Sequence, residues 1–214
     1  MDRMMHSLDR RSLLIAAAGL ALMGRAAHAQ QIDTARATAF IQQTGEELVT
    51  AINAAGAPVA QRRERVAAVL RRAVDVEGVG RFILGRFWRS ANAEQQAEYL
   101  KLFEEILIRN LSARFGEYQG VRFALGRSQA RTEDDVLVNT VIERPGGPPF
   151  SLDWRVAEVG GQPRVVDVIA EGTSLRLTTR SEYSSVITRG GSDVGALLAA
   201  MRQQIQQLAA REGG

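Results

Sequence analysis

The stretch Phe150-Ser151-Leu152-Asp153-Trp154-Arg155-Val156 decides the fold class of this chain. Apolar side chains occupy every second position, and polar or charged side chains fill the positions between them. A period of two is typical of a β-strand. A strand with one apolar and one polar side is typical of an antiparallel sheet whose two faces meet different surroundings. We therefore predict an antiparallel sheet with one buried face.

The same alternation continues on both sides of this stretch. The apolar side chains that share a face are Val121, Phe123 and Leu125 in one segment and Val136, Val138, Thr140 and Ile142 in the next. Segments rich in Gly and Pro, at 145–148 and 160–163, supply the turns. The last strand, at about 164–170, is apolar on both sides except for Asp167, which predicts a central place in the sheet.

Helical segments stand before and after the strands. Residues 33–115 and 179–211 carry apolar residues at helical spacing, whereas residues 121–177 have the period of strands. The individual helices are expected at about 33–54, 59–74, 76–87 and 92–114, with Asn92 and Gln95 as a capping pair and Ser192 as the cap of a last helix. Segregated blocks predict an α+β fold, with a single antiparallel sheet covered on one face by several amphipathic helices.

The predicted helix at 92–114 has a wide apolar arc. Its apolar residues are Tyr99, Leu100, Leu102, Phe103, Ile106, Leu107, Ile108 and Leu111. One packing stripe needs fewer, so we expect this helix to contact the core on one side and a second apolar surface on another. A sheet covered by helices can close tightly or leave a cavity between the layers, and the pattern alone favours neither.

The first 29 residues have the three parts of a signal peptide. A basic start with the pair Arg10 and Arg11 precedes an apolar run at 13–23, and Ala27-His28-Ala29 is an A-x-A cleavage site. The run is shorter than the roughly 20 residues that span a bilayer, so no stable membrane anchor is expected. The arginine pair resembles a twin-arginine export signal, with an ordinary secretory signal as the alternative. We expect one domain, residues 30–214, exported to the periplasm as a soluble protein.

The composition excludes several classes of chemistry. The chain has no cysteine and only two histidines, His6 and His28, both within the predicted signal. A mature chain without these residue types cannot assemble a Ser-His-Asp or Cys-His site. It also lacks the usual ligands of zinc, haem and iron–sulfur clusters. No metal and no cofactor are therefore predicted.

The charge balance points away from nucleic acids. The chain holds 27 basic and 24 acidic residues, a net charge of +3. The predicted signal contains four arginines and two aspartates, so the mature chain would carry +1. Nucleic-acid binding normally requires a strong basic footprint, and we expect no nucleic-acid partner.

Three segments together resemble the MlaC family of periplasmic phospholipid-binding proteins. They are residues 80–91, which include Gly85-Arg86-Phe87-Trp88, residues 94–103, which open with Glu94-Gln95, and residues 166–175. Arg180, Tyr183 and the pair Gly190-Gly191 complete a resemblance that covers about residues 35–205. Gln162-Pro163 stands where many members carry a tryptophan. The arginine pair of the signal and Asp153-Trp154-Arg155 look closer to a hopanoid-associated branch.

The resemblance implies a cavity between the sheet and the helices that holds phospholipid acyl chains. It implies a carrier that moves lipid between an outer-membrane lipoprotein complex and an inner-membrane ABC transporter complex, and so maintains lipid asymmetry. It implies no catalytic group. A hopanoid or another amphiphile is the alternative ligand of the same fold.

Twelve residues are candidates for the wall of such a cavity. They are Phe82, Ile83, Phe87, Trp88, Phe103, Ile106, Leu107, Leu111, Val138, Leu152, Trp154 and Tyr183. Packing in an ordinary core is the competing interpretation for each of them. Arg180 is the candidate that would hold a phosphate head group, and a surface ion pair with Glu182 or another acid is its alternative.

Two other classes of protein stay open on the residues alone. The first is an enzyme of cone-shaped α+β fold with Asp167 as general base. Asp167 is flanked by valines, which favours bonds to neighbouring backbone or to an arginine instead. The second is an interaction module with a filled core. The adjacent acidic pairs Glu104–Glu105 and Asp134–Asp135 are expected to be solvated and not catalytic.

Overall fold

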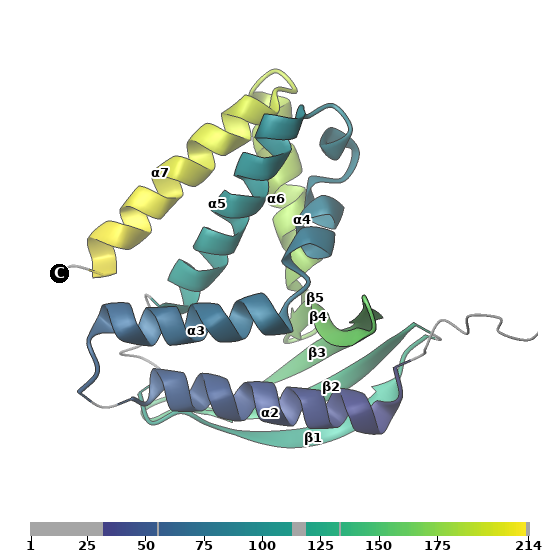
Figure 1. The fold of residues 1–214 in the computed structure, drawn as a ribbon, viewed down its shortest axis with the longest axis vertical. Coiled ribbons are helices and arrows are strands. Elements are labelled where there is room, and N and C mark those ends of the chain that lie inside the picture. The colour runs from purple at the N-terminus through teal and green to yellow at the C-terminus, as the bar shows by residue number, and fades with distance from the viewer. Residues whose placement is uncertain (1–31, 55, 113–118, 133, 213–214) are drawn as a thin grey trace, which may run out of the picture. The chain divides into compact units, whose positions relative to one another are not determined.

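The computed structural model describes residues 32–54, 56–112, 119–132 and 134–212 (Figure 1). The predicted signal peptide with its cleavage site, and the last two residues of the helix predicted at 92–114, lie outside these residues. Within the described residues the chain forms six α-helices, one 3-10 helix and a five-stranded sheet. The predicted α+β class with a single antiparallel sheet is confirmed.

The sheet is an antiparallel meander in the order β1-β2-β3-β4-β5. Its strands are β1 (Arg122–Ala130), β2 (Asp135–Glu143), β3 (Phe150–Val159), β4 (Gln162–Ala170) and β5 (Thr173–Ser174). Val138 pairs with Trp154 and Thr140 pairs with Leu152. The apolar positions of neighbouring strands therefore share one face, as the alternation predicts.

Strand β4 is not central, contrary to the prediction. Its outer neighbour β5 has two residues and pairs only with Ile169 and Ala170. Helices cover the rest of this edge, and the backbone N–H of Asp75 donates to the Val165 carbonyl oxygen at 3.1 Å. The contacts of α3, α4 and α6 with β4 explain why the strand is apolar on both sides.

The helices form two groups. They are α2 (Thr34–Ile52), α3 (Val59–Ala73), α4 (Val76–Leu84), η1 (Gly85–Trp88), α5 (Ala93–Ser112), α6 (Leu175–Arg189) and α7 (Val194–Glu212). Helix α2 lies along the sheet and contacts β1, β2, β3 and β4 (Figure 1). Helices α4, α5, α6 and α7 pack mainly on one another, and α3 connects the two groups. The sheet is thus covered chiefly by α2, and the other helices build a second core.

Side-chain caps set several helix starts. Asn92 and Gln95 each accept the backbone N–H of the other, at 2.8 and 3.1 Å, which confirms the predicted capping pair. Ser174 caps α6, so residues 175–177 are helical and not part of a strand. The predicted cap Ser192 is wrong because its φ is 65°, and Asp193 accepts the N–H of Gly195 instead.

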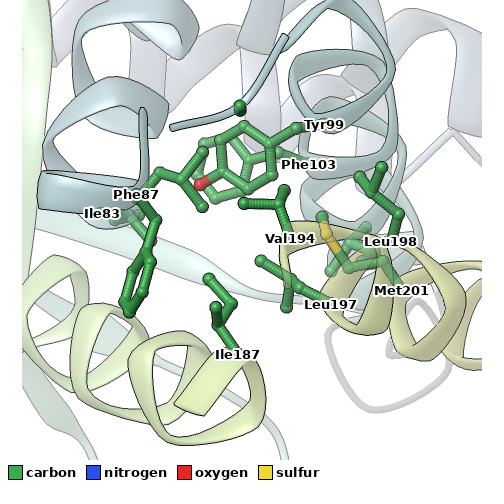
Figure 2. Packing of buried hydrophobic residues seen from close by; sticks show 12 residues of the cluster. Ile83, Phe87, Tyr99, Phe103, Ile187, Val194, Leu197, Leu198 and Met201 are labelled. Atoms are coloured by element: carbon green, nitrogen blue, oxygen red, sulfur yellow. The ribbon is translucent and has the colours of Figure 1, made fainter. Parts of the chain in front are cut away.

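Most of the buried apolar residues of the described chain form three separate clusters. The largest lies among α4, α5, α6 and α7 and includes Tyr99 and Phe103 (Figure 2). The Tyr99 ring contacts the rings of Trp88, Phe103 and Tyr183. The Tyr99 hydroxyl donates to the Gly80 carbonyl oxygen at 3.0 Å. A second cluster lies between the N-terminal half of α2 and the sheet, and a third joins the C-terminal end of α2 to α3.

Candidate functional site

An apolar cavity of about 500 Å³ lies between α2 and the inner face of the sheet. Its lining comes from all the main layers of the domain. The lining residues are Ile41, Thr44, Gly45, Leu48, Val49, Ile52, Leu70, Leu111, Val121, Phe123, Thr140, Ile142, Phe150, Leu152, Trp154, Val168, Ala170 and Leu175. Among the described residues the lining contains no charged side chain, so this part of the cavity suits an apolar ligand and not an ionic one.

The spacing of apolar residues on α2 and on the strands places them on the two sides of the cavity. On α2, Ile41, Leu48 and Ile52 recur at seven- and four-residue spacing and so project from one side of the helix. On the sheet, the alternating residues of β2 and β3 point to the same side. The cavity is therefore the space that remains between an apolar helix stripe and an apolar sheet face.

A glycine on α2 shapes the wall near the edge strand β1. A Cβ atom at Gly45 would lie 2.5 to 2.8 Å from three atoms of the Phe123 ring. Gly45 therefore lets this ring lie directly against the helix backbone. Any side chain at this position would push the ring away and change the shape of the cavity.

The few polar atoms of the lining are distributed on opposite walls. On the sheet, the Trp154 indole N–H donates to Thr140 Oγ1 at 2.8 Å. Thr140 is 1% exposed, so this hydrogen bond satisfies polar atoms that the apolar wall would otherwise leave without partners. On the helix side, Thr44 is 4% exposed.

The cavity reaches the surface beside the first residue of α6. Leu175 is 47% exposed and is the one lining residue in the exposed class, while the others are buried or half-buried. Leu177, two residues further along, is 55% exposed. Two leucines at the start of α6, one of them in the cavity lining, are thus exposed to solvent.

The structure divides the predicted lining residues into two groups. Leu111, Leu152 and Trp154 line the cavity, and Val138 is buried next to it, between α2 and the sheet. The remaining eight belong to the cluster among α4, α5, α6 and α7 or pack against it, and they are absent from the cavity lining: Phe82, Ile83, Phe87, Trp88, Phe103, Ile106, Leu107 and Tyr183. Figure 2 shows three of them, Ile83, Phe87 and Phe103. Burial raises the pKa of the Tyr183 hydroxyl to about 12, as expected inside a packed core.

Sequence reasoning did not select most of the wall. The lining residues of α2, and Phe123, Ile142, Phe150 and Val168 of the sheet, were visible only as members of apolar faces. Alternation and helical spacing identify which side of an element is buried. They do not say whether a protein side chain or an empty space lies opposite.

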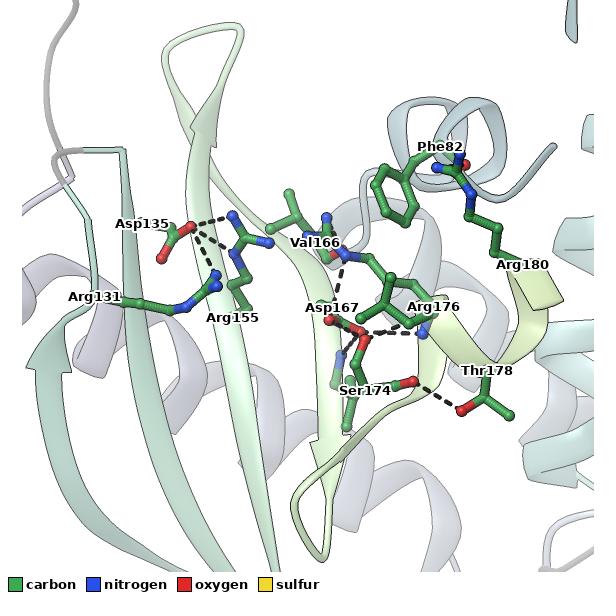
Figure 3. Close-up of polar contacts among 12 residues, drawn as sticks. Phe82, Arg131, Asp135, Arg155, Val166, Asp167, Ser174, Arg176, Thr178 and Arg180 are labelled. Atoms are coloured by element: carbon green, nitrogen blue, oxygen red, sulfur yellow. Dashed lines mark hydrogen bonds and ion pairs between the residues drawn. The ribbon is translucent and has the colours of Figure 1, made fainter. Parts of the chain in front are cut away.

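Arg180 packs on an aromatic ring. Its guanidinium group lies 4.9 Å from the centre of the Phe82 ring, and Nη1 donates to the Phe82 carbonyl oxygen at 3.1 Å (Figure 3). Among the described residues no acidic side chain forms an ion pair with Arg180, so the expected pair with Glu182 is not formed. The alternative contact is a cation–π interaction, which satisfies the cation without an acid. The role of Arg180 toward a head group stays a prediction.

Asp167 is held by its neighbours. Its carboxylate accepts hydrogen bonds from Ser174 Oγ at 2.6 Å, Val168 N at 2.9 Å and Arg176 N at 3.2 Å (Figure 3). Burial raises its pKa above the usual range. Val168 lines the cavity, so Asp167, one position earlier, lies on the opposite face of the sheet. These contacts agree with the expected bonds to backbone, and they place Asp167 away from the cavity.

Asp135 is the second buried acid of this outer face. It is 2% exposed and forms ion pairs with Arg155 and Arg131, which corrects the expectation that Asp134–Asp135 is solvated (Figure 3). The sequence did not predict the burial of Asp135 because its partner Arg155 comes from the neighbouring strand. Glu104 and Glu105 pair separately, with Arg71 and Arg109.

The described residues offer neither a metal site nor a membrane-spanning helix. Within the described ranges, no group of three or more Asp, Glu, His or Cys side chains has a geometry that could hold a metal ion. In the same residues, every helix is too short or too polar to cross a bilayer.

The fold and the cavity define a small α+β domain that encloses an apolar space between a sheet and its covering helix. The chain belongs to the MlaC family: the family model described as "MlaC protein" matches residues 40–203. The resemblance of the sequence motifs is thereby confirmed. Membership in a hopanoid-associated branch stays a prediction.

Individual relatives agree with this assignment. The intermembrane phospholipid transport system binding protein MlaC of Haemophilus influenzae is 23% identical over 177 residues, which cover 78% of this chain and 81% of the relative. The toluene tolerance protein ttg2D of Pseudomonas putida is 22% identical over 127 residues, 59% of each chain. A phospholipid-binding protein from Ralstonia solanacearum, solved in complex with a phospholipid, superposes with a TM-score of 0.72 at 24% identity, over 81% of this chain and 98% of that one. This last comparison shows the shared fold.

Proposed function

We propose that this protein is a non-enzymatic phospholipid carrier whose acyl-chain site is the cavity between α2 and the sheet. The observation that carries the proposal is the lining of that cavity, which is apolar and uncharged over the described residues. Burial of an acyl chain gains about 0.8 kcal/mol per methylene, so a greasy wall is sufficient to hold a lipid tightly. The names of the relatives, which refer to phospholipid binding and transport, support the same ligand class.

The orientation of the lipid follows from the opening. Acyl chains would occupy the space among α2, Phe123 and Trp154, and the head group would stay near Leu175, where the lining reaches solvent. Arg180 lies five residues after Leu175 on α6, and its guanidinium group is the candidate for contact with the phosphate. Eight aromatic and aliphatic candidates of the helical bundle would then serve the stability of the domain and not the ligand.

The cellular role extends this proposal. The signal-like first 29 residues support export to the periplasm as a soluble protein. The carrier would receive or deliver lipid at an outer-membrane lipoprotein complex and at an inner-membrane ABC transporter complex. This role is supported by the intermembrane transport named for the Haemophilus influenzae relative.

The structure supports the two alternative classes of protein, an interaction module and an enzyme that uses Asp167, less well than a carrier. An interaction module with a filled core is at odds with a cavity of about 500 Å³. A hydrolytic or isomerising site at Asp167 would need that carboxylate to face a substrate pocket. Asp167 instead lies on the face opposite the cavity and is engaged with Ser174 and Arg176.

Native mass spectrometry of the protein purified from a Gram-negative host tests the proposal. We expect a bound phospholipid, identified by its mass after release. Ala170→Trp places a large side chain in the lining and should reduce the bound fraction, whereas Ala124→Trp, on an exposed position of β1, is the matched control and should not. A polycyclic mass in place of a phospholipid would favour the hopanoid alternative. Absence of any bound amphiphile from the folded protein would contradict a carrier function.

A further inference from the structure

One hydroxyl in the cavity wall has no hydrogen-bond partner among the residues that the structure describes. Thr44 lies in the middle of α2 and is 4% exposed, so the free surface of its side chain is the surface that it shows to the cavity. Among the described residues, no group makes a hydrogen bond with its hydroxyl. The Thr44 oxygen is not fully enclosed by protein atoms and is therefore open to the cavity. A ligand that filled the cavity without supplying an acceptor would leave this hydroxyl buried without a hydrogen bond, which is rare in proteins.

Comparison within the same chain shows how unusual this is. Five polar or charged residues are buried in the described part, and the other four, Ser112, Asp135, Thr140 and Asp167, all form side-chain hydrogen bonds or ion pairs. On α2 itself, Thr38 donates to the Thr34 carbonyl oxygen at 2.7 Å and Thr50 donates to that of Glu46 at 2.8 Å. Helical threonines commonly satisfy themselves in this way. Thr44 does not.

A water molecule that enters the empty cavity can bond this hydroxyl, but it finds few other polar partners there and is displaced when an acyl chain fills the space. A buried water needs two to four polar partners. The polar atoms on the opposite wall are already engaged, because Thr140 Oγ1 accepts the Trp154 indole N–H and lies 3.4 Å from the Leu152 carbonyl oxygen. The rest of the surrounding lining is apolar. The hydroxyl therefore calls for a single acceptor that arrives with the ligand.

We propose that Thr44 is a specificity-determining residue that donates a hydrogen bond to an ester carbonyl oxygen of the bound lipid. The inference rests on the proposed function and identifies the ligand as an acyl ester. In a phospholipid the ester carbonyls are the neutral acceptors at the junction of the apolar chains and the glycerol. The charged head group cannot occupy a wall position that is 4% exposed, and methylene groups cannot accept a hydrogen bond.

Paired ester and ether lipids test this assignment directly. A diacyl phosphatidylglycerol and its dialkyl ether analogue of equal chain length differ in the carbonyl oxygens alone. We expect the delipidated protein to bind the ester lipid about three- to tenfold more tightly, the range of one hydrogen bond. Thr44→Val should remove this preference, and Thr44→Ser should keep it.

The control variant is Thr50→Val, which changes the same residue type on the same helix outside the cavity and should leave the ester preference intact. Equal affinity of the wild type for both lipids would overturn the role of Thr44, and so would an unchanged preference in Thr44→Val. Failure of the folded wild type to bind either lipid would instead contradict the proposed carrier function. Circular dichroism of each variant establishes that it is folded.

Discussion

At the scale of single residues, Gly45 shows how one missing side chain shapes the cavity. Gly45→Ala brings two opposed effects. Alanine favours the helix by about 1 kcal/mol, but its Cβ would lie 2.5 to 2.8 Å from the Phe123 ring. We expect the collision to dominate and to lower the free energy of unfolding by about 1–3 kcal/mol in urea unfolding.

The cause of that loss can be isolated. In a Phe123→Leu background the ring is gone, so Gly45→Ala should then stabilise the protein by up to about 1 kcal/mol. A change of sign between the two backgrounds identifies the ring contact. Stabilisation by Gly45→Ala in both backgrounds would show that Phe123 does not depend on this glycine.

Asp167 gives a prediction about pH. Burial raises its pKa, and the hydrogen bonds from Ser174 and Val168 offset only part of that effect. The pKa in the folded state exceeds the unfolded value of about 3.9. The protonated carboxyl group therefore makes its full contribution to the free energy of unfolding at pH values below about 3.9. This contribution is lost as the pH rises through the folded pKa. The stability of the wild type relative to Asp167→Asn should therefore decrease from about pH 3.5 to pH 7 in urea unfolding. An increase would mean that the ion pair with Arg176 outweighs burial.

At the scale of elements, α5 links two apolar regions that differ in kind. Phe103 and Leu111 lie eight residues apart on this helix. Phe103 is 3% exposed in the packed helical cluster, whereas Leu111 lines the cavity. The wide apolar arc of the helix therefore has two causes, and only one of them concerns the ligand.

Matched substitutions on α5 separate these two regions. Phe103→Leu should lower the free energy of unfolding by about 1–2 kcal/mol because it leaves a void in a packed core, with no change in the amount of lipid that co-purifies. Leu111→Trp should reduce the bound lipid by filling the cavity. Urea unfolding and native mass spectrometry of the same samples provide the two readouts. Loss of lipid from folded Phe103→Leu would indicate that residues of the helical cluster also contribute to lipid binding.

The same two residues explain what the sequence could predict. Periodicity correctly identifies the elements, the shared sheet face and the Asn92–Gln95 cap, because these depend on neighbours within a few positions. It cannot distinguish Phe103 from Leu111, because both occupy the apolar arc of one helix. The burial of Asp135 depends on Arg155 from another strand. Contacts between residues that are distant in the sequence therefore account for the differences between the predicted and the observed surroundings of these side chains.

At the scale of the whole molecule, the hydrophobic core is divided into separate clusters. A bound ligand could fill the apolar space that lies next to two of them. Two of the three buried clusters, the one between α2 and the sheet and the one that joins α2 to α3, border a space of about 500 Å³, whereas the cluster of the other helices does not. An empty apolar void of this size would cost on the order of 10 kcal/mol, comparable with the entire stability of a domain. Water can enter beside Leu175 and lower this cost, but it does not replace the lost apolar contacts.

Stability should therefore depend on lipid. Removal of bound lipid with organic solvent or detergent, followed by refolding, should lower the melting temperature, and added phospholipid at about 100 times its Kd should raise it by about 5–10 °C. Differential scanning calorimetry measures both steps, with lipid content followed by mass. Ala170→Trp should melt at nearly the same temperature with and without lipid, since its side chain occupies the space that the acyl chain would fill. Equal melting temperatures for loaded and delipidated wild type would show instead that the clusters close on each other when the lipid leaves.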